Sequence, residues 1–261
     1  MKIACVQTEI VWEDQARNFL KAGSLIKNAS KEGADLVCLP ELFSTGVTMD
    51  SLKFAEGLSG PTCSFLSETS KKNGTYILGS FIEKSNGGEL PKNSVVLYDH
   101  YGKLVCKYSK NHVFTFGNEC VSYSNGSGIA NYKIGEFVFF PFICYDLRFP
   151  EIFRAAIDKG ANAFIISANW PNPRKEHWMT LLKTRAIENQ SYVIGINRAG
   201  KSPDLTFFGS SMILSPKGEV IAEAGDKEEI IYGNIDAKEV SDWREKFTAL
   251  KDRRKDYYNS L

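Results

Sequence analysis

Short apolar blocks alternate with amphipathic segments along most of this chain. Apolar blocks predict buried strands at residues 2–8, 34–40, 75–83, 92–99, 102–110, 135–145, 162–169, 191–197, 207–216 and 228–236. Segments with apolar residues at helical spacing predict helices at residues 14–33, 60–74, 150–161 and 175–190. The sequence DHYG at residues 99–102 predicts a hairpin turn between two of the strands.

The order of these elements determines the fold class. Helices and hairpins are mixed, so a purely parallel sheet built of strand–helix–strand units does not fit. The pattern instead predicts an α/β domain with two sheets packed against each other inside and helices outside. We find no internal repeat or linker, so we expect one domain over residues 1–261, with a charged tail at 237–261 that has little core of its own.

Composition and charge narrow the class of protein. The chain has 261 residues, of which 43% are hydrophobic and 12% aromatic, which is ample for a buried core. The net charge is +1 and the only notable basic cluster is KDRRK at 251–255, so we expect no nucleic-acid partner. No secretory leader is visible and no apolar stretch is long enough to span a bilayer, so we expect no membrane partner.

The pattern of cysteines and histidines argues against disulfide bonds and against a zinc site. The six cysteines form no Cys-x-x-Cys pair, which is typical of reduced thiols and predicts a cytoplasmic protein. The three histidines lie far apart and match no zinc pattern, so we expect no metal.

Three chemically capable residues stand where predicted strands end. Glu41 follows LVCLP, Lys110 ends CKYSK, and Cys144 ends the apolar run FFPFIC. Active sites collect at the carboxyl ends of strands in α/β proteins. A thiolate can attack a carbonyl carbon, a carboxylate can carry the proton, and a lysine can stabilise the oxyanion. If the three residues meet, they form an acyl-transfer site.

Each of the three also has a structural explanation. A cysteine in an apolar run often packs as a small buried hydrophobe. A carboxylate just after a proline is often the N-terminal charge of a helix. A lysine at a strand end often lies in solvent. The residues alone leave these alternatives open.

Three stretches together resemble the nitrilase superfamily of carbon–nitrogen hydrolases. LPELFSTG (39–46) is similar to the glutamate motif of that family, YSKNHVF (108–114) to its lysine motif, and ICYDLRFPE (143–151) to its cysteine motif. The motifs occur in the family's order, and the resemblance covers nearly the whole chain. It implies a single-domain αββα four-layer sandwich, a Glu–Lys–Cys triad and no cofactor.

The resemblance assigns a role to each residue that matches a motif. It implies that Glu41 is the general base, Lys110 the oxyanion stabiliser and Cys144 the nucleophile. The backbone N–H of Tyr145, just after the nucleophile, then also serves the oxyanion. Glu119 occupies the place of a second family glutamate, which positions Lys110 or the substrate. We also expect Lys110 to favour the thiolate of Cys144.

A further stretch narrows the substrate. SANWPNPRKEHWMTLLKTRAIENQSYVIGINRAG (167–200) resembles the ω-amidase branch, which hydrolyses the terminal amide of small 2-oxo dicarboxylic acid monoamides such as 2-oxoglutaramate to the acid and ammonia. Such a small-molecule substrate carries a carboxylate, for which Arg174 is the candidate partner. Pairing of Arg174 with Glu176 is the alternative. Trp170 and Phe116 are candidate pocket walls, although core packing also explains such aromatic residues.

Other functions compete with this interpretation. The same triad serves aliphatic amidases, nitrilases, N-carbamoyl amino acid hydrolases and amidases of deaminated glutathione. A non-enzymatic binding module and a thiol-exchange protein are less favoured, because the triad is intact and no resolving cysteine lies nearby. The resemblance also implies a homodimer or a larger homo-oligomer, with the tail at 237–261 in the contact.

Overall fold

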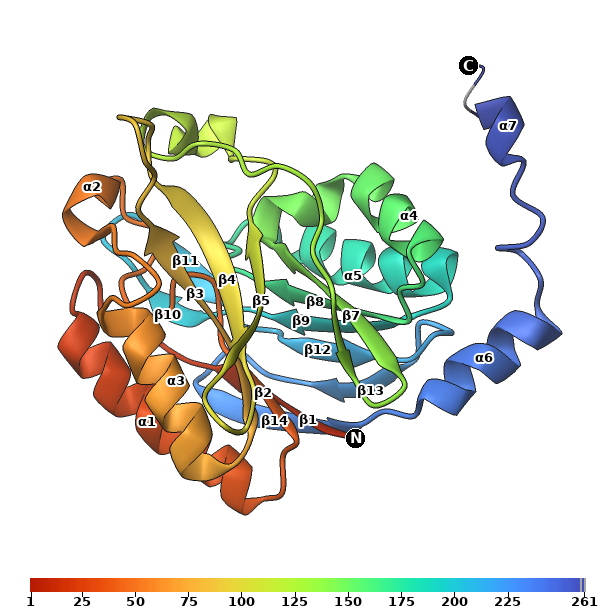
Figure 1. The fold of residues 1–261 in the computed structure, drawn as a ribbon, viewed down its shortest axis with the longest axis horizontal. Coiled ribbons are helices and arrows are strands. Elements are labelled where there is room, and N and C mark those ends of the chain that lie inside the picture. Colours follow the sequence, from red (N-terminus) through yellow and green to blue (C-terminus); the bar gives the residue numbers. More distant parts are fainter. Residues whose placement is uncertain (259, 261) are drawn as a thin grey trace.

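Two six-stranded sheets form the centre of the molecule (Figure 1). The structure is a computed structural model that describes residues 1–258 and residue 260. The first sheet has the order β14-β1-β2-β3-β4-β5 and is built from Glu229–Asn234, Lys2–Gln7, Leu36–Cys38, Tyr76–Glu83, Lys92–Tyr98 and Leu104–Ser109. The second has the order β13-β12-β9-β8-β7-β6 and is built from Val220–Glu223, Met212–Leu214, Tyr192–Ile196, Ala163–Ser167, Phe137–Ile143 and Tyr132–Ile134.

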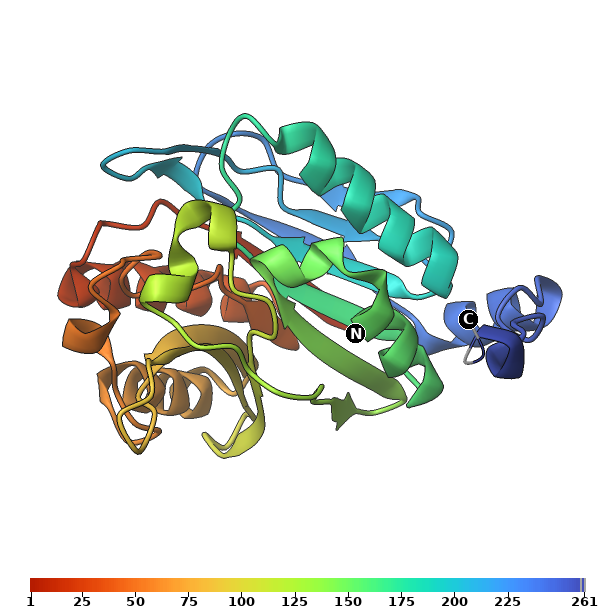
Figure 2. The ribbon, with the colours of Figure 1, turned by 90° about the horizontal axis from the view of Figure 1, so that it is seen from above.

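Helices cover the outer face of each sheet, as Figure 2 shows from above. Helices α1 (Gln15–Lys31) and α3 (Pro61–Asn73) lie on the first sheet, and α4 (Pro150–Asp158) and α5 (Lys175–Asn189) lie on the second. The predicted four-layer αββα sandwich is therefore confirmed. A short α2 (Ser51–Phe54) and the small pair β10 (Ala199–Lys201) and β11 (Thr206–Phe208) were not predicted as separate elements.

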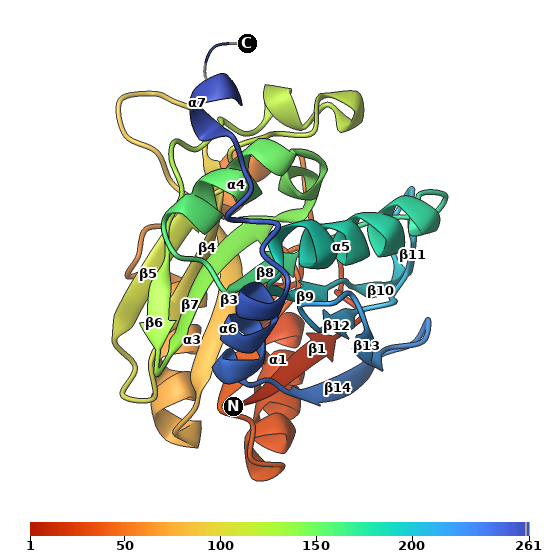
Figure 3. The same ribbon diagram turned by 90° about the vertical axis from the view of Figure 1, so that its right-hand side faces the viewer.

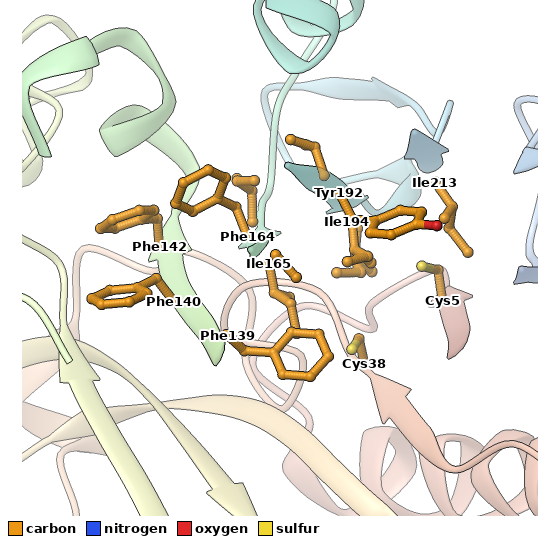
Figure 4. Packing of buried hydrophobic residues seen from close by; sticks show 14 of the residues in the cluster. Cys5, Cys38, Phe139, Phe140, Phe142, Phe164, Ile165, Tyr192, Ile194 and Ile213 are labelled. Atoms are coloured by element: carbon orange, nitrogen blue, oxygen red, sulfur yellow. The ribbon is translucent and has the colours of Figure 1, made fainter. Parts of the chain in front are cut away.

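The side-chain alternation of the strands builds two separate cores. In β1, Ile3 and Cys5 belong to the core between the sheets, whereas Ala4 and Val6 pack under helices α1 and α3. This period of two follows from the pleat of the strand. Figure 4 shows Cys5 and Cys38 of the first sheet in one cluster with aromatic and aliphatic side chains of the second. The apolar strands are thus buried on both faces, which explains why they read as nearly continuous apolar runs.

One predicted strand is wrong in its extent. The apolar run at 207–216 is divided between β11 and β12, because the chain turns at Gly209 and Ser210, whose φ angles are +65° and +52°. Positive φ is strained for residues with a side chain, so a run of apolar residues cannot continue as a flat strand there.

The chain leaves the sandwich at its C-terminal end (Figures 1 and 3). Helix α6 (Ala237–Lys246) and the short α7 (Lys255–Tyr258) follow β14. Val240 is the one buried residue of α6, which agrees with the small core predicted for this tail. Arg253 and Lys255 contact Asp158 at the end of α4 at 2.8 and 2.7 Å and hold the tail against the body. No helix in the described part of the chain has both the length and the apolar character needed to cross a membrane.

Candidate active site

The residues predicted from the strand ends meet in one buried cluster. Glu41 follows β2, Lys110 follows β5, and Cys144 follows β7. The Nζ atom of Lys110 lies 3.0 Å from Oε1 of Glu41, and 2.9 and 2.8 Å from the two carboxylate oxygens of Glu119. The side chains of these three charged residues are only 1–2% exposed. One ammonium therefore sits between two carboxylates, out of contact with bulk water.

Two asparagines complete the surroundings of Glu41. Nδ2 of Asn93 donates to Oε1 at 2.7 Å, and the backbone N–H of Asn169 donates to Oε2 at 2.8 Å. The side-chain amide of Asn169 also donates to the carbonyl oxygen of Glu41. The next residue, Leu42, has a φ of +42°, so the backbone turns sharply just after the carboxylate. These contacts fix the carboxylate in one orientation.

The charge of Lys110 is stabilised by its neighbours. Burial by itself lowers the pKa of a lysine, but the carboxylates of Glu119 and Glu41 outweigh it and raise the pKa of Lys110 well above its usual value. The thiol of Cys144 acts on this pKa in the same direction. Lys110 is therefore a fixed cation across the neutral pH range, and its raised pKa excludes it as a general base there.

Cys144 lies on a sharp turn between a strand and a 3₁₀-helix. The helix η3 (Cys144–Arg148) begins directly after β7, and Cys144 itself has a φ of +44°. A positive φ is uncommon at a residue with a side chain. Such residues are found more often at functional sites, where the surrounding structure maintains the conformation. The turn lifts the sulfur out of the strand and into the cavity, which explains why the apolar run ends in a thiol.

The pKa of Cys144 depends more on burial than on the expected effect of Lys110. Burial raises the pKa of this thiol well above its usual value, and the negative charges of Glu41 and Glu119 add to the increase. Lys110 lowers this pKa as expected, but it does not outweigh the other effects. The resting nucleophile is thus a thiol rather than a thiolate, and an adjacent base must remove its proton during attack.

The carboxylate of Asp146 connects the lysine loop to the nucleophile turn. Asp146, which is fully buried, accepts from the backbone N–H of His112 at 3.1 Å and lies 2.7 Å from Nδ1 of the same residue. Its other oxygen accepts from Tyr108 Oη at 2.7 Å and from the backbone N–H of Ile143 at 3.1 Å. These contacts give His112 a structural role between the lysine loop and the nucleophile turn.

The cluster opens into a cavity of about 520 Å³. The residues that line it come from both sheets and include three of the predicted substrate-binding residues, Tyr145, Trp170 and Arg174. Phe116 is the exception. Its side chain is 83% exposed and it does not line the cavity, whereas Phe114 does. The sequence places both rings in one short loop, and only the path of the 3₁₀-helix η1 (Thr115–Gly117) decides which one turns inward.

Two partly buried guanidinium groups stand in the cavity. The Cζ atom of Arg148 lies 4.9 Å from the ring centre of Trp170, and that of Arg174 lies 5.3 Å from the ring centre of Phe114. Neither arginine forms an ion pair with a carboxylate among the residues that the structure describes, so the alternative pair of Arg174 with Glu176 is absent. Arg148 donates through Nη2 to Nδ1 of His177 at 3.1 Å and is a second cation on the wall of the cavity.

A third arginine, Arg198, stabilises the wall of the cavity by hydrogen bonds to the main chain. Arg198 is fully buried and donates through Nη2 to the carbonyl oxygens of Ile10 and Lys201, both at 2.9 Å. Burial lowers the pKa of Arg198 to about 10. Its guanidinium group holds the segment that carries β10 and β11, which contributes Ser202, Leu205 and their neighbours to the lining.

Sequence reasoning missed four residues of the site. Asn93, Phe114, Arg148 and Asn169 touch the cluster or the cavity. A signal was present for the two asparagines, because each is a polar residue at an end of an otherwise apolar block (KNSVVLY and AFIISAN). The two others offered no local signal. Among residues 1–258 and 260, no group of three His, Cys, Asp or Glu side chains is placed to hold a metal ion.

The arrangement is suited to acyl transfer. A partly buried thiol, a carboxylate with an oriented oxygen and a permanent cation surround one end of a cavity. The thiol can become a nucleophile when a base takes its proton, and the cation can stabilise an oxyanion in this water-poor surrounding. The two guanidinium groups on the cavity wall, which have no carboxylate partner among the described residues, add a place for an anionic group of the ligand.

Known proteins share this sequence and fold. The family model described as carbon-nitrogen hydrolase matches residues 2–245. A 2-oxoglutaramate amidase of Bacillus subtilis is 38% identical over 98% of this chain and 98% of its own. A nitrilase of Pyrococcus abyssi is 34% identical over 99% of each chain. A solved structure of a CN-hydrolase superfamily protein from Xanthomonas campestris superposes with a TM-score of 0.91 at 30% identity, covering 97% of each chain.

Proposed function

Because the chain belongs to the carbon–nitrogen hydrolase family, we propose that it cleaves the terminal amide of a small 2-oxo dicarboxylic acid monoamide, of the 2-oxoglutaramate type, to the acid and ammonia. It is a hydrolase of carbon–nitrogen bonds other than peptide bonds. The observation that carries the substrate class is the pair of guanidinium groups, Arg148 and Arg174, in the cavity that Cys144 enters. The 2-oxoglutaramate amidase of Bacillus subtilis, which resembles this chain over almost its full length, supports the same class.

In the first half of the proposed reaction, Glu41 takes the proton of the Cys144 thiol as the sulfur attacks the amide carbon. The oxyanion that forms is stabilised by Nζ of Lys110 and the backbone N–H of Tyr145. Glu41 then gives the proton to the nitrogen as the C–N bond breaks, so ammonia leaves and a thioester remains. The raised pKa of Cys144 supports this order, because proton removal and attack must occur together.

In the second half, water takes the place that ammonia left. Glu41 removes a proton from the water as its oxygen attacks the thioester carbon, and Lys110 again stabilises the oxyanion. The C–S bond breaks, the sulfur takes the proton back, and the carboxylic acid leaves. Glu119 touches neither the thiol nor the substrate in this scheme. It holds Lys110 in place through both of its oxygens.

The test of the proposed function is ammonia release from 2-oxoglutaramate, run beside glutamine, a simple nitrile and an N-carbamoyl amino acid. We expect rapid release from the oxo-amide and little from the others. Glutamine is the sharp control, because it differs only in carrying an ammonium group where the substrate has a 2-oxo group. Preferential turnover of the nitrile or the carbamoyl compound would contradict the substrate class and leave the thiol chemistry standing.

Substitution of the cavity arginines tests how the carboxylate is held. We expect Arg174→Met and Arg148→Met each to raise the KM for 2-oxoglutaramate roughly 10- to 100-fold, because a hydrogen bond between charged groups contributes about 1.5–3 kcal/mol. Steady-state kinetics with a neutral aliphatic amide is the matched control, and its kcat/KM should hardly change. An equal loss on both substrates would remove that arginine from carboxylate binding.

We also propose that the chain forms a homodimer through its C-terminal tail. Three aromatic residues of residues 237–258 stand well exposed, since Phe247, Tyr257 and Tyr258 keep 54, 47 and 51% of their surface. Exposed aromatic side chains are typical of contact surfaces. Elution from a sizing column at the mass of one 29.2 kDa chain would contradict this proposal.

A further inference from the structure

Asn93 links the two charged groups of the candidate catalytic cluster. It lies near the start of β4 with 1% of its surface exposed. Its Nδ2 atom donates to Oε1 of Glu41 at 2.7 Å, the same oxygen that accepts from Lys110 at 3.0 Å. Its backbone carbonyl accepts from the backbone N–H of Lys110 at 2.8 Å. One residue therefore holds the carboxylate by its side chain and the lysine by its main chain.

The orientation of this amide is set by the carboxylate. Oδ1 of Asn93 is buried and has no hydrogen-bond partner among the described residues. The opposite orientation would place Oδ1 against a carboxylate oxygen, where two acceptors repel each other. An unpaired buried carbonyl costs about 1–3 kcal/mol, and stability alone does not account for this cost. The hydrogen bond from Nδ2 to the charged carboxylate of Glu41 does account for it, because the amide can make that bond only by leaving Oδ1 unpaired.

From these contacts we propose that Asn93 is a positioning residue that keeps the Glu41 carboxylate oriented as the proton acceptor for Cys144. The proposal rests on the role proposed above for Glu41. The Glu41 carboxylate accepts hydrogen bonds from three donors. They are the Lys110 ammonium, the Asn93 amide and the Asn169 backbone N–H. Of these, the Asn93 amide is the one neutral side chain. It holds the orientation of the carboxylate without adding a charge that would compete for the thiol proton.

Four charged or titratable groups lie around Glu41 and could also affect the pH dependence of activity. Lys110 contacts it directly, and Glu119 reaches it through Lys110. Cys144 and the buried Tyr123 also interact with its charge, and the pKa of each is raised in part by Glu41. All four remain unchanged in the variants below, so a change in pH dependence reports on position 93.

Two substitutions at this position separate orientation from charge. Asn93→Leu removes the donor at similar size, and we expect kcat to fall roughly 10²-fold while KM changes little. Asn93→Asp places a second carboxyl group beside Glu41. Because two carboxylates this close cannot both ionise freely, we expect the acid limb of the kcat/KM profile to move up by about one pH unit or more.

Ser94→Ala is the matched control on the same strand. Ser94 is also fully buried and also donates to a carboxylate, that of Glu83 at 2.6 Å, outside the cluster. We expect this variant to keep the kcat and the acid limb of the unmodified protein. If the Asn93 variants lose activity only in proportion to their unfolded fraction, and Asn93→Asp keeps the original acid limb, the positioning role is wrong and Asn93 is structural.

A second measurement makes the outcome independent of the substrate. Alkylation of Cys144 by iodoacetamide, followed by mass spectrometry of its peptide, also needs a base to take the thiol proton. We expect Asn93→Asp to move the acid limb of this alkylation rate upward as well, and Ser94→Ala to leave it in place. An unmoved limb overturns the inference. Silence of the unmodified protein toward oxo-amides, with the limb displaced, would overturn only the proposed substrate.

Discussion

Cys144→Ala is expected to lower the turnover of 2-oxoglutaramate by roughly 10⁶-fold, the scale seen when a covalent nucleophile is removed. Among the described residues that line the cavity beside Lys110 and Glu41, Cys144 supplies the one thiol. Without it no thioester can form, and water in the same place would have to attack an unactivated amide. The fold should persist, because Cys144 is a partly exposed residue at the edge of the core and loses only one sulfur atom.

Ammonia release and intact-protein mass spectrometry measure this effect together. The unmodified protein should show an acyl adduct on rapid quenching, and Cys144→Ala should show none. Cys120→Ala is the matched control, because Cys120 is an exposed thiol next to Glu119 that does not line the cavity. It should retain full activity. Substantial turnover by Cys144→Ala would show that another group is the nucleophile.

Lys110→Met is expected to impair both activity and folding. Loss of the oxyanion stabiliser should lower kcat by about 10²–10³-fold. The variant also leaves Glu41 and Glu119 buried with no cation between them, and removal of one partner from a buried ion pair costs about 3–5 kcal/mol of unfolding free energy. The two carboxylates can relieve their repulsion by taking up a proton, which would also remove Glu41 as a base.

The destabilisation caused by Lys110→Met should grow as the pH rises. Protonation neutralises the uncompensated carboxylates in the folded variant, so the folded state binds more protons than the unfolded one at neutral pH. Stability then rises as the pH falls. We expect the stability lost in Lys110→Met to be smaller at about pH 5 than at about pH 8, measured by urea unfolding. A loss that is equal at both values would contradict the electrostatic cause.

Lys107→Met is the matched control for this variant. Lys107 precedes Lys110 by three residues, its side chain is 40% exposed, and it pairs with Glu83. An exposed pair of this kind contributes about 0–1 kcal/mol, so stability should change little. Activity should not change, since Lys107 does not line the cavity.

Much of the candidate site could be predicted because it lies at strand ends. Glu41, Lys110 and Cys144 each follow an apolar run, and active sites collect at such strand ends. The strands themselves are not neighbours: β2 and β5 belong to one sheet and β7 to the other, so the packing of the two sheets brings the three residues together. The contacts of Glu41 could not be predicted in this way, because Asn93 and Asn169 are 52 and 128 residues away along the chain.

The sequence by itself determined the layers of the fold and the order of its main strands and helices, and it supplied the residues that we propose as the reactive ones. Hydrophobic periodicity is a local property and reports burial directly. The tertiary structure alone decided that Phe114 rather than Phe116 lines the cavity, that Arg148 also lines it, and that Cys144 rests as a thiol. These outcomes depend on burial and on charges brought together from distant segments, and both exist only once the two sheets have packed.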